Sequence, residues 1–290
     1  MRNKLLLLVV VVLSPFAVIS FFKSKETNFY LVEKEIYLKD YEKKMPLNDY
    51  VIGVVAAEMP ALFHEEALKA QSVVARTFAL YQMEHKGYVT LGDQAYITEE
   101  DMHKKWQDKY DIYYQKIKDA VNATGNICIY YQNNLIKAYY FSLSNGSTED
   151  AISVFNESYD YIKPVDTSFD VDNKNFIHNY NFNESDFKSL LNINSINNIK
   201  IVKDEQNYVS KVIIDDHEFS GINIRKILNL KSASFDISKN NNEILITTYG
   251  YGHGVGLSQN GANYLANQGY SYQDIIKYFY QNITLKDYNV

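Results

Sequence analysis

Apolar side chains recur at helical spacing along two early segments of the chain. The first segment begins at Leu47, and Pro60 stops its pattern, which predicts a short helix that ends just after Glu58. The second predicted helix runs over Glu65–Lys86 and opens with two acidic residues, which suit the positive N-terminal end of a helix. Glu58 is therefore expected at a helix end, among residues that favour burial.

The pattern then predicts a third helical stretch and a hairpin. Thr98 is expected to cap the helix, with Asp101 three residues further on, and Gly125 marks its end. Two runs of β-branched and aromatic residues follow, over Ile127–Tyr131 and 135–142, separated by a Gln-Asn-Asn turn. These features predict helices first and an antiparallel hairpin after them.

Residues 163–249 alternate short strand candidates with Asn-rich turns. Strands are predicted at 200–202 and 212–214, and one small helix at 222–230. We interpret this segment as an inserted or appended α+β subdomain. The whole chain is therefore predicted to be an α+β protein with a helical N-terminal part, β-hairpins and a mixed subdomain.

The first residues carry the signature of export. Residues 5–22 form an apolar run that only two serines and a proline interrupt, with two basic residues on each side. About 18 apolar positions reach the lower limit for a membrane-spanning helix, and no clear cleavage site follows. We therefore predict a cytoplasmic stub and an uncleaved, single-pass signal anchor at 1–26, with residues 27–290 outside the cytoplasm.

Composition excludes several classes of protein. The chain has 290 residues, 46% of them hydrophobic, and a formal charge of -6, so it is globular in character and lacks the basic clusters that bind nucleic acid. Cys128 is its one cysteine, which excludes an internal disulfide and a zinc site built of several thiolates. The six histidines are dispersed, and neither Ser144 nor Ser258 lies in a G-x-S-x-G motif. We predict no cofactor and no metal ion.

Glu58 is the leading candidate for chemistry. It follows the small apolar residues 54–57 and precedes Met59 and Pro60. A carboxyl group desolvated in this way has a raised pKa, as a general acid requires near neutral pH. The alternative is a carboxylate at the rim of the fold, paired with a nearby lysine or arginine.

Lys69 and Arg76 lie seven residues apart on the second predicted helix, and therefore on one face. If the preceding turn brings that face beside Glu58, the two cations can hold sugar substituents or carboxylates. The alternative is a solvated helix face.

A Gly-rich stretch at 250–261 precedes a helical segment. Its glycines allow close approach of the backbone, but it has no Walker lysine and fits G-x-G-x-x-G poorly, so we exclude a nucleotide loop. The wall of a sugar groove fits better, with His253 and Gln259 as hydrogen-bonding groups. Further on, Ser271 and Asp274 predict a capping box at the start of the last helix.

Three separated blocks of the sequence resemble the SpoIID family, which includes stage II sporulation protein D and shares a domain with amidase-enhancer proteins. The blocks are 54–60 with 66–77, 138–142 with 146–149, and 252–262. In order, spacing and residue type they follow the family pattern. In one respect the chain departs from it, because some relatives carry a zinc-binding His and Cys where Phe141 and Ser144 stand, and neither of these is an adequate ligand.

The resemblance implies a lytic transglycosylase of peptidoglycan that acts during engulfment of the forespore. The implied substrate is a glycan strand stripped of stem peptides, and the implied partners are a cell-wall amidase and a membrane anchor protein of the same machinery. The implied location is the mother-cell membrane, with the catalytic domain facing the space between the septal membranes. A non-catalytic glycan binder that stimulates an amidase is the alternative.

The resemblance also assigns residues. Glu58 falls on the family's catalytic glutamate, which acts first as acid and then as base, and so needs no second carboxylate of the kind that a hydrolase uses. The predicted substrate-binding residues are Lys69, Arg76, Ser144, Thr148, Glu149, His253, Ser258 and Gln259.

Overall fold

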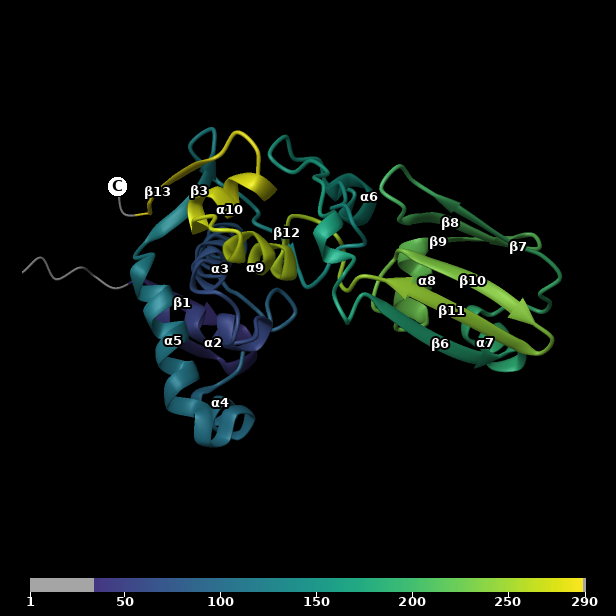
Figure 1. The fold of residues 1–290 in the computed structure, drawn as a ribbon, viewed down its shortest axis with the longest axis horizontal. Helices are drawn as coiled ribbons and strands as arrows, with labels where there is room; N and C mark the ends of the chain where they lie inside the picture. The colour runs from purple at the N-terminus through teal and green to yellow at the C-terminus, as the bar shows by residue number, and fades with distance from the viewer. Residues whose placement is uncertain (1–33, 289–290) are drawn as a thin grey trace, which may run out of the picture. The chain divides into compact units, whose positions relative to one another are not determined.

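The computed structural model describes residues 34–288, which form an α+β protein with several small sheets (Figure 1). The fold class predicted from the sequence is therefore confirmed for this part of the chain. The predicted anchor at 1–26 lies outside the described residues. Over residues 34–288, no helix combines the length and the apolar character needed to cross a bilayer.

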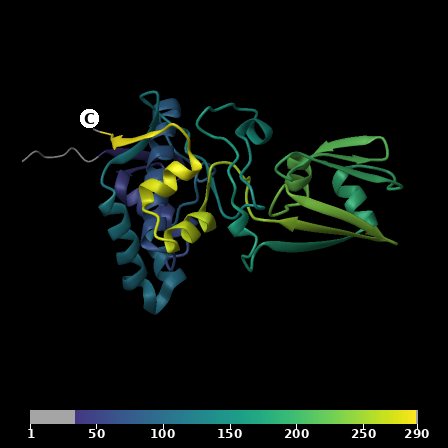
Figure 2. The ribbon, with the colours of Figure 1, turned by 45° about the horizontal axis from the view of Figure 1, so that its top comes forward.

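Helix α3 (Glu65–Lys86) forms the centre of the helical part. Most of its side chains between Ala67 and Gln82 are buried, and it packs against α2, α5, α9 and α10. Figures 1 and 2 show α9 and α10, drawn in yellow, beside α3 although they come from the far end of the chain. His64 caps the helix by accepting a hydrogen bond from Glu66 N, and Gly87 ends it at a φ of 78°. The predicted bounds of this helix are confirmed.

The helices and short helical turns of this part are α2 (Leu47–Glu58), α4 (Glu99–Trp106), α5 (Tyr110–Ala123), α6 (Ala151–Phe155), α9 (Gln259–Asn267), α10 (Tyr272–Phe279) and the 3₁₀ turns Lys39–Tyr41, Gln107–Lys109 and Ser168–Asp170. Its strands are β1 (Glu35–Leu38), β2 (Lys43–Pro46), β3 (Ile127–Tyr131), β4 (Asn134–Leu135), β5 (Tyr140–Phe141), β12 (Leu257–Ser258) and β13 (Thr284–Asp287). Both predicted capping boxes, at Thr98 and Ser271, are present.

The third predicted helix is two helices. Gln107 takes a φ of 48°, which breaks the hydrogen-bond ladder between α4 and α5. The hairpin prediction is also right only in part. β3 pairs with β4 across a turn in which Gln132 and Asn133 have positive φ, but the predicted strand at 135–142 does not continue as one strand.

Strand β5 instead pairs in parallel with β12, with Tyr140 opposite Leu257 and Phe141 opposite Ser258. The glycines of the loop before β12 allow this close packing. A Cβ atom at Gly256, whose φ is 81°, would lie 2.0 Å from Tyr139 O, which excludes any side chain there. The loop thus packs closely against the backbone at Tyr139. The pairing of β5 with β12 brings the start of α9 next to the end of α2.

Residues 177–249 build a second core of their own. Its helices are α7 (Glu184–Leu191) and α8 (Gly221–Ile227), and its strands are β6 (Ile177–Asn183), β7 (Ile199–Lys203), β8 (Val209–Ile214), β9 (His217–Ser220), β10 (Phe235–Asn240) and β11 (Glu243–Tyr249). The strands form two antiparallel sheets, in the orders β10-β11-β6 and β7-β8-β9. Side chains from both sheets and both helices share one buried cluster that includes Phe187, Val212 and Phe235.

Candidate functional site

A cavity of about 430 Å³ contains Glu58, the last residue of α2. Its wall combines side chains from α3, from the loop after α3, from the region of β5, and from the Gly-rich loop. The lining residues are Glu58, Phe78, Gln82, Lys86, Leu91, Gly92, Asp93, Gln94, Ala95, Lys137, Tyr139, Tyr140, Phe155 and His253. The cavity thus collects segments that lie far apart in the sequence around one carboxyl group.

Three hydrogen-bond donors hold the carboxyl group of Glu58. Ala95 N donates to Oε1 over 2.9 Å, and the Tyr140 hydroxyl donates to the same oxygen over 3.3 Å. Gln259 Nε2 approaches Oε2 at 3.5 Å. Glu58 therefore has a defined orientation, and Gln259, which was expected in the same groove, lies within hydrogen-bond distance of it.

Burial raises the pKa of Glu58 above its usual range. The hydrogen bonds from Ala95, Gln259 and Tyr140 oppose this change, and so does the nearby charge of Lys105, whose Nζ donates to Ala56 O at 2.8 Å. The cost of desolvation exceeds these effects. A proton is therefore held more tightly than on an exposed glutamate, as a general acid requires.

A series of hydrogen bonds between buried polar groups holds Tyr140 in place. Gln94 Nε2 donates to the Tyr140 hydroxyl at 3.1 Å, and Gln94 Oε1 accepts from Tyr50 at 3.2 Å. Tyr50 is fully buried and Gln94 nearly so. The sequence pattern predicts no role for these three residues, because a contact between a helix, a loop and a strand leaves no signal in residue spacing.

His253 forms an uncharged part of the cavity wall. Burial, together with the charge of Arg225, lowers the pKa of His253 to about 3. The rings of Tyr139, Phe141 and Phe155 surround the imidazole at centroid distances of 5.9, 5.7 and 5.1 Å. His253 thus lies in the cavity with Glu58 and presents a neutral imidazole among aromatic rings.

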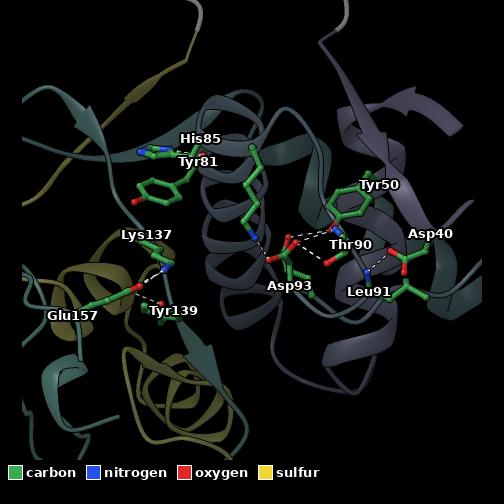
Figure 3. A network of polar contacts seen from close by, with 12 residues as sticks. Asp40, Tyr50, Tyr81, His85, Thr90, Leu91, Asp93, Lys137, Tyr139 and Glu157 are labelled. Carbon is green, nitrogen blue, oxygen red and sulfur yellow. Dashed lines mark hydrogen bonds and ion pairs between the residues drawn. The ribbon is translucent and has the colours of Figure 1, made fainter. Parts of the chain in front are cut away.

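Two ion pairs involve lysines of the cavity wall. Lys86 contacts Asp93 at 2.8 Å, and Lys137 contacts Glu157 at 2.8 Å. Figure 3 shows Glu157 between Lys137 and Tyr139, and Asp93 beside Thr90. Neither pair was predicted from the sequence, because Lys86 ends α3 while Asp93 lies in the loop after it, and Lys137 and Glu157 come from separate loops.

Ser144 and Ser258 meet at another group, the buried carboxyl of Asp170. Ser258 Oγ donates to Asp170 Oδ2 at 2.6 Å and Ser144 N donates to the same oxygen at 3.0 Å. Ser258 also caps α9 by accepting from Gly261 N. Both serines are fully buried, so they fix the loop next to the cavity and do not line it.

Thr148 and Glu149 are also placed away from Glu58. Thr148 is buried, and its hydroxyl accepts a hydrogen bond from Val165 N. Glu149 lines a separate cavity of about 210 Å³, which residues of the second core, among them Asp204 and Tyr208, help to form. Burial, with the Asp204 carboxyl beside it, raises the pKa of Glu149 to about 8.

The expected placement of Lys69 and Arg76 beside Glu58 is wrong. Lys69 pairs with Glu65 and Glu66 on the first turn of its own helix. Arg76 is fully buried, and its guanidinium donates to Val121 O, Ile127 O and Thr124 Oγ1. The inner face of α3 packs into the core, so Arg76 joins α3 to the end of α5 and the start of β3.

Among the described residues, no three His, Cys, Asp or Glu side chains come together as a metal site would require. At the loop where some relatives are expected to hold zinc, Phe141 packs against His253, and the Ser144 hydroxyl hydrogen-bonds Thr167 at 2.6 Å. Both positions therefore have structural partners in this chain.

The geometry defines a class of site: one oriented carboxyl group with a raised pKa, in a cavity of amides, aromatic rings and paired charges. Such a site suits general acid–base chemistry on a polar ring compound that can stack on aromatic side chains. No serine or cysteine is among the described residues that line the cavity, and Cys128 is buried in the core.

Comparison with known proteins gives the family. Residues 39–131 match the SpoIID model, described as stage II sporulation protein, and this range contains α2, α3 and Glu58. The chain is 36% identical over 259 residues to stage II sporulation protein D of Bacillus subtilis (strain 168), across 84% of this chain and 76% of that protein. The protein of the same name from Bacillus amyloliquefaciens is also 36% identical over 259 residues, across 84% and 75%. The chain therefore belongs to the SpoIID family of sporulation proteins.

A further relative is the amidase enhancer of Bacillus subtilis (strain 168). It is 26% identical over 295 residues, which cover 81% of this chain and 40% of that longer protein. The family resemblance identified from the three sequence blocks is thus confirmed.

Proposed function

We propose that this chain is a peptidoglycan lytic transglycosylase that cleaves the bond between N-acetylmuramic acid and N-acetylglucosamine in strands stripped of stem peptides. The observation that carries this proposal is Glu58, a single carboxyl group with a raised pKa, held by three donors inside the cavity. Protonated Glu58 gives its proton to the glycosidic oxygen as the bond to C1 of N-acetylmuramic acid breaks. The carboxylate then takes the proton of the C6 hydroxyl, whose oxygen closes on C1 to give a 1,6-anhydro end.

Among the described residues that line the cavity, Asp93 is the other carboxylate. Whether its carboxylate is free to react distinguishes hydrolysis from the proposed reaction. A hydrolase needs a second carboxylate that is free to act as nucleophile or to activate water. Asp93 Oδ1 contacts Lys86, and its Oδ2 accepts from Thr90 N and Thr90 Oγ1 at 3.0 and 2.8 Å. Burial alone would raise the pKa of Asp93, but these contacts outweigh it and lower the pKa. Asp93 thus acts as a support for the loop, which favours the one-carboxyl reaction.

The experiment is incubation of the purified chain with peptide-free glycan strands in ¹⁸O-labelled water, followed by mass spectrometry of the ends. Anhydro-muramic acid ends without incorporated ¹⁸O are the expected products. Reducing ends that carry ¹⁸O would instead identify a hydrolase. If the folded protein cleaves no strand, the proposal of an enzyme fails.

The second candidate is a non-catalytic glycan binder that stimulates a cell-wall amidase, favoured by the similarity to the amidase enhancer. Addition of the chain to such an amidase would then raise amidase activity, and Glu58→Gln would preserve that effect.

For either function we propose the same setting: a single-pass anchor at 1–26, the remainder outside the cytoplasm, and septal wall as target during engulfment of the forespore. An amidase and a membrane anchor protein are the proposed partners.

A further inference from the structure

Lys137 is a firmly held cation in the wall of the cavity. Its Nζ contacts both oxygens of Glu157, at 2.8 and 2.9 Å, and lies 5.0 Å from the centroid of the Tyr139 ring. Only 17% of its side chain is exposed. Lys86, the other cation of the wall, has 41% of its side chain exposed and one oxygen contact, to Asp93. Lys137 is therefore the better preorganised of the two.

The ion pair leaves Lys137 able to bind a ligand. A lysine ammonium has three N–H groups, and the two oxygens of Glu157 engage at most two of them. Tyr139 and Tyr159 also donate to Glu157, each at 2.8 Å, so the negative charge of Glu157 is shared among three donors. Glu157 does not line the cavity, whereas Lys137 does. Glu157 thus fixes the position of the ammonium group, and at least one of its N–H groups remains for an acceptor in the cavity.

We infer that Lys137 recognises the lactyl carboxylate of a muramic acid residue from which the stem peptide has been removed. This inference rests on the proposed function and adds the residue that selects the substrate. Removal of the peptide converts a neutral amide into a carboxylate, and a lysine forms a hydrogen-bonded ion pair only with the carboxylate. An intact stem peptide offers Lys137 a neutral amide at that position. Selection by charge therefore favours stripped strands.

The test compares two substrates that differ at one group: peptide-free strands, and the same strands with each lactyl carboxylate converted to its methylamide. Cleavage is measured as kcat/KM for anhydro ends, and binding as Kd by calorimetry in a Glu58→Gln background. We expect the unmodified chain to prefer the free acid by about tenfold in both measurements. Lys137→Met should bring this ratio close to one by weakening only the reaction with the free acid. Lys137→Arg, which keeps the charge, should retain a preference.

The chain contains a matched control outside the cavity. Lys203 contacts Asp236 at 2.8 Å, lies 5.7 Å from the Tyr249 ring centroid, and shares its acid with the Tyr249 hydroxyl. Lys203→Met should leave the preference for the free acid intact. A tenfold preference that survives Lys137→Met in a protein with an unchanged melting temperature would overturn the inference, as would no preference in the unmodified chain. If no strand is cleaved, the proposed function fails, but the binding ratio still decides the role of Lys137.

Discussion

The hydroxyl of Tyr140 donates a hydrogen bond to Glu58 Oε1 over 3.3 Å, although the two residues are 82 positions apart in the chain. The parallel pairing of β5 with β12 produces this contact, because it fixes Tyr140 on one strand and places Gln259 directly after the other. Glu58 is then held from both sides. Its pKa reflects a balance, with burial raising it and the hydrogen bonds lowering it.

Glu58→Gln should abolish cleavage and preserve binding. Glutamine keeps the size and much of the polarity of the side chain but has no proton to give to the glycosidic oxygen. We expect kcat to fall by about 10³-fold or more, with Kd for peptide-free glycan changed by less than about threefold. Cleavage is measured by mass spectrometry of the anhydro ends and binding by calorimetry. Appreciable cleavage by this variant would remove Glu58 from the mechanism.

Tyr140→Phe should move the pH dependence of cleavage. The hydrogen bond from Tyr140 lowers the pKa of Glu58, so its loss should raise that pKa further. The acid must be protonated to act, and activity therefore falls as the pH rises through its pKa. This alkaline limb of kcat/KM should shift to higher pH in the variant, and Tyr249→Phe, which loses a hydrogen bond to Asp236 in the second core, should not shift it. An unchanged limb would mean that Tyr140 does not act on Glu58.

Local signals in the sequence predicted the helices well. α3 has its predicted bounds, and the capping boxes at Thr98 and Ser271 are where the side chains predict them, because caps and periodicity depend on neighbours within a turn or two. The break at Gln107 and the parallel partner of β5 were missed. Both depend on tertiary packing, which spacing along the chain does not encode.

The same distinction applies to the site. Glu58 is recognisable from its apolar neighbours, and the Gly-rich loop that carries His253 is recognisable from its composition. Tyr140 and Gln94 are ordinary members of a strand and a loop until the fold brings them to Glu58. Arg76 was instead assigned to the site and does not belong there. A charged residue at regular spacing on a helix suggested an exposed face, but the structure buries Arg76 in the core.

Arg76→Met should destabilise the fold. The guanidinium makes three hydrogen bonds in the core, and its loss leaves the carbonyl oxygens of Val121 and Ile127 without that donor. We expect the free energy of unfolding to fall by about 3 kcal/mol, measured by urea denaturation. Lys69→Met, which removes a partly buried cation paired with Glu65 and Glu66 on its own helix, should cost less, about 1 kcal/mol. Equal, small effects of the two substitutions would contradict the structural role of Arg76.

Glu149→Gln should remove part of the pH dependence of stability. Among the described residues nothing donates to Glu149 Oε2, and the Asp204 carboxyl beside it favours the protonated form of Glu149. Because the pKa of Glu149 is about 8 in the fold and near 4.5 in the unfolded chain, the native state binds the additional proton between these values. The free energy of unfolding must therefore fall as the pH rises from about 4.5 to about 8, with the contribution fully present at the acidic end.

Glutamine imitates the protonated form, so the variant should match the unmodified chain near pH 5 and exceed its melting temperature at pH 8. Glu205→Gln, at an exposed position next to Asp204, is the control. A melting temperature for Glu149→Gln that follows the unmodified chain across this range would show that Glu149 keeps its charge in the folded protein.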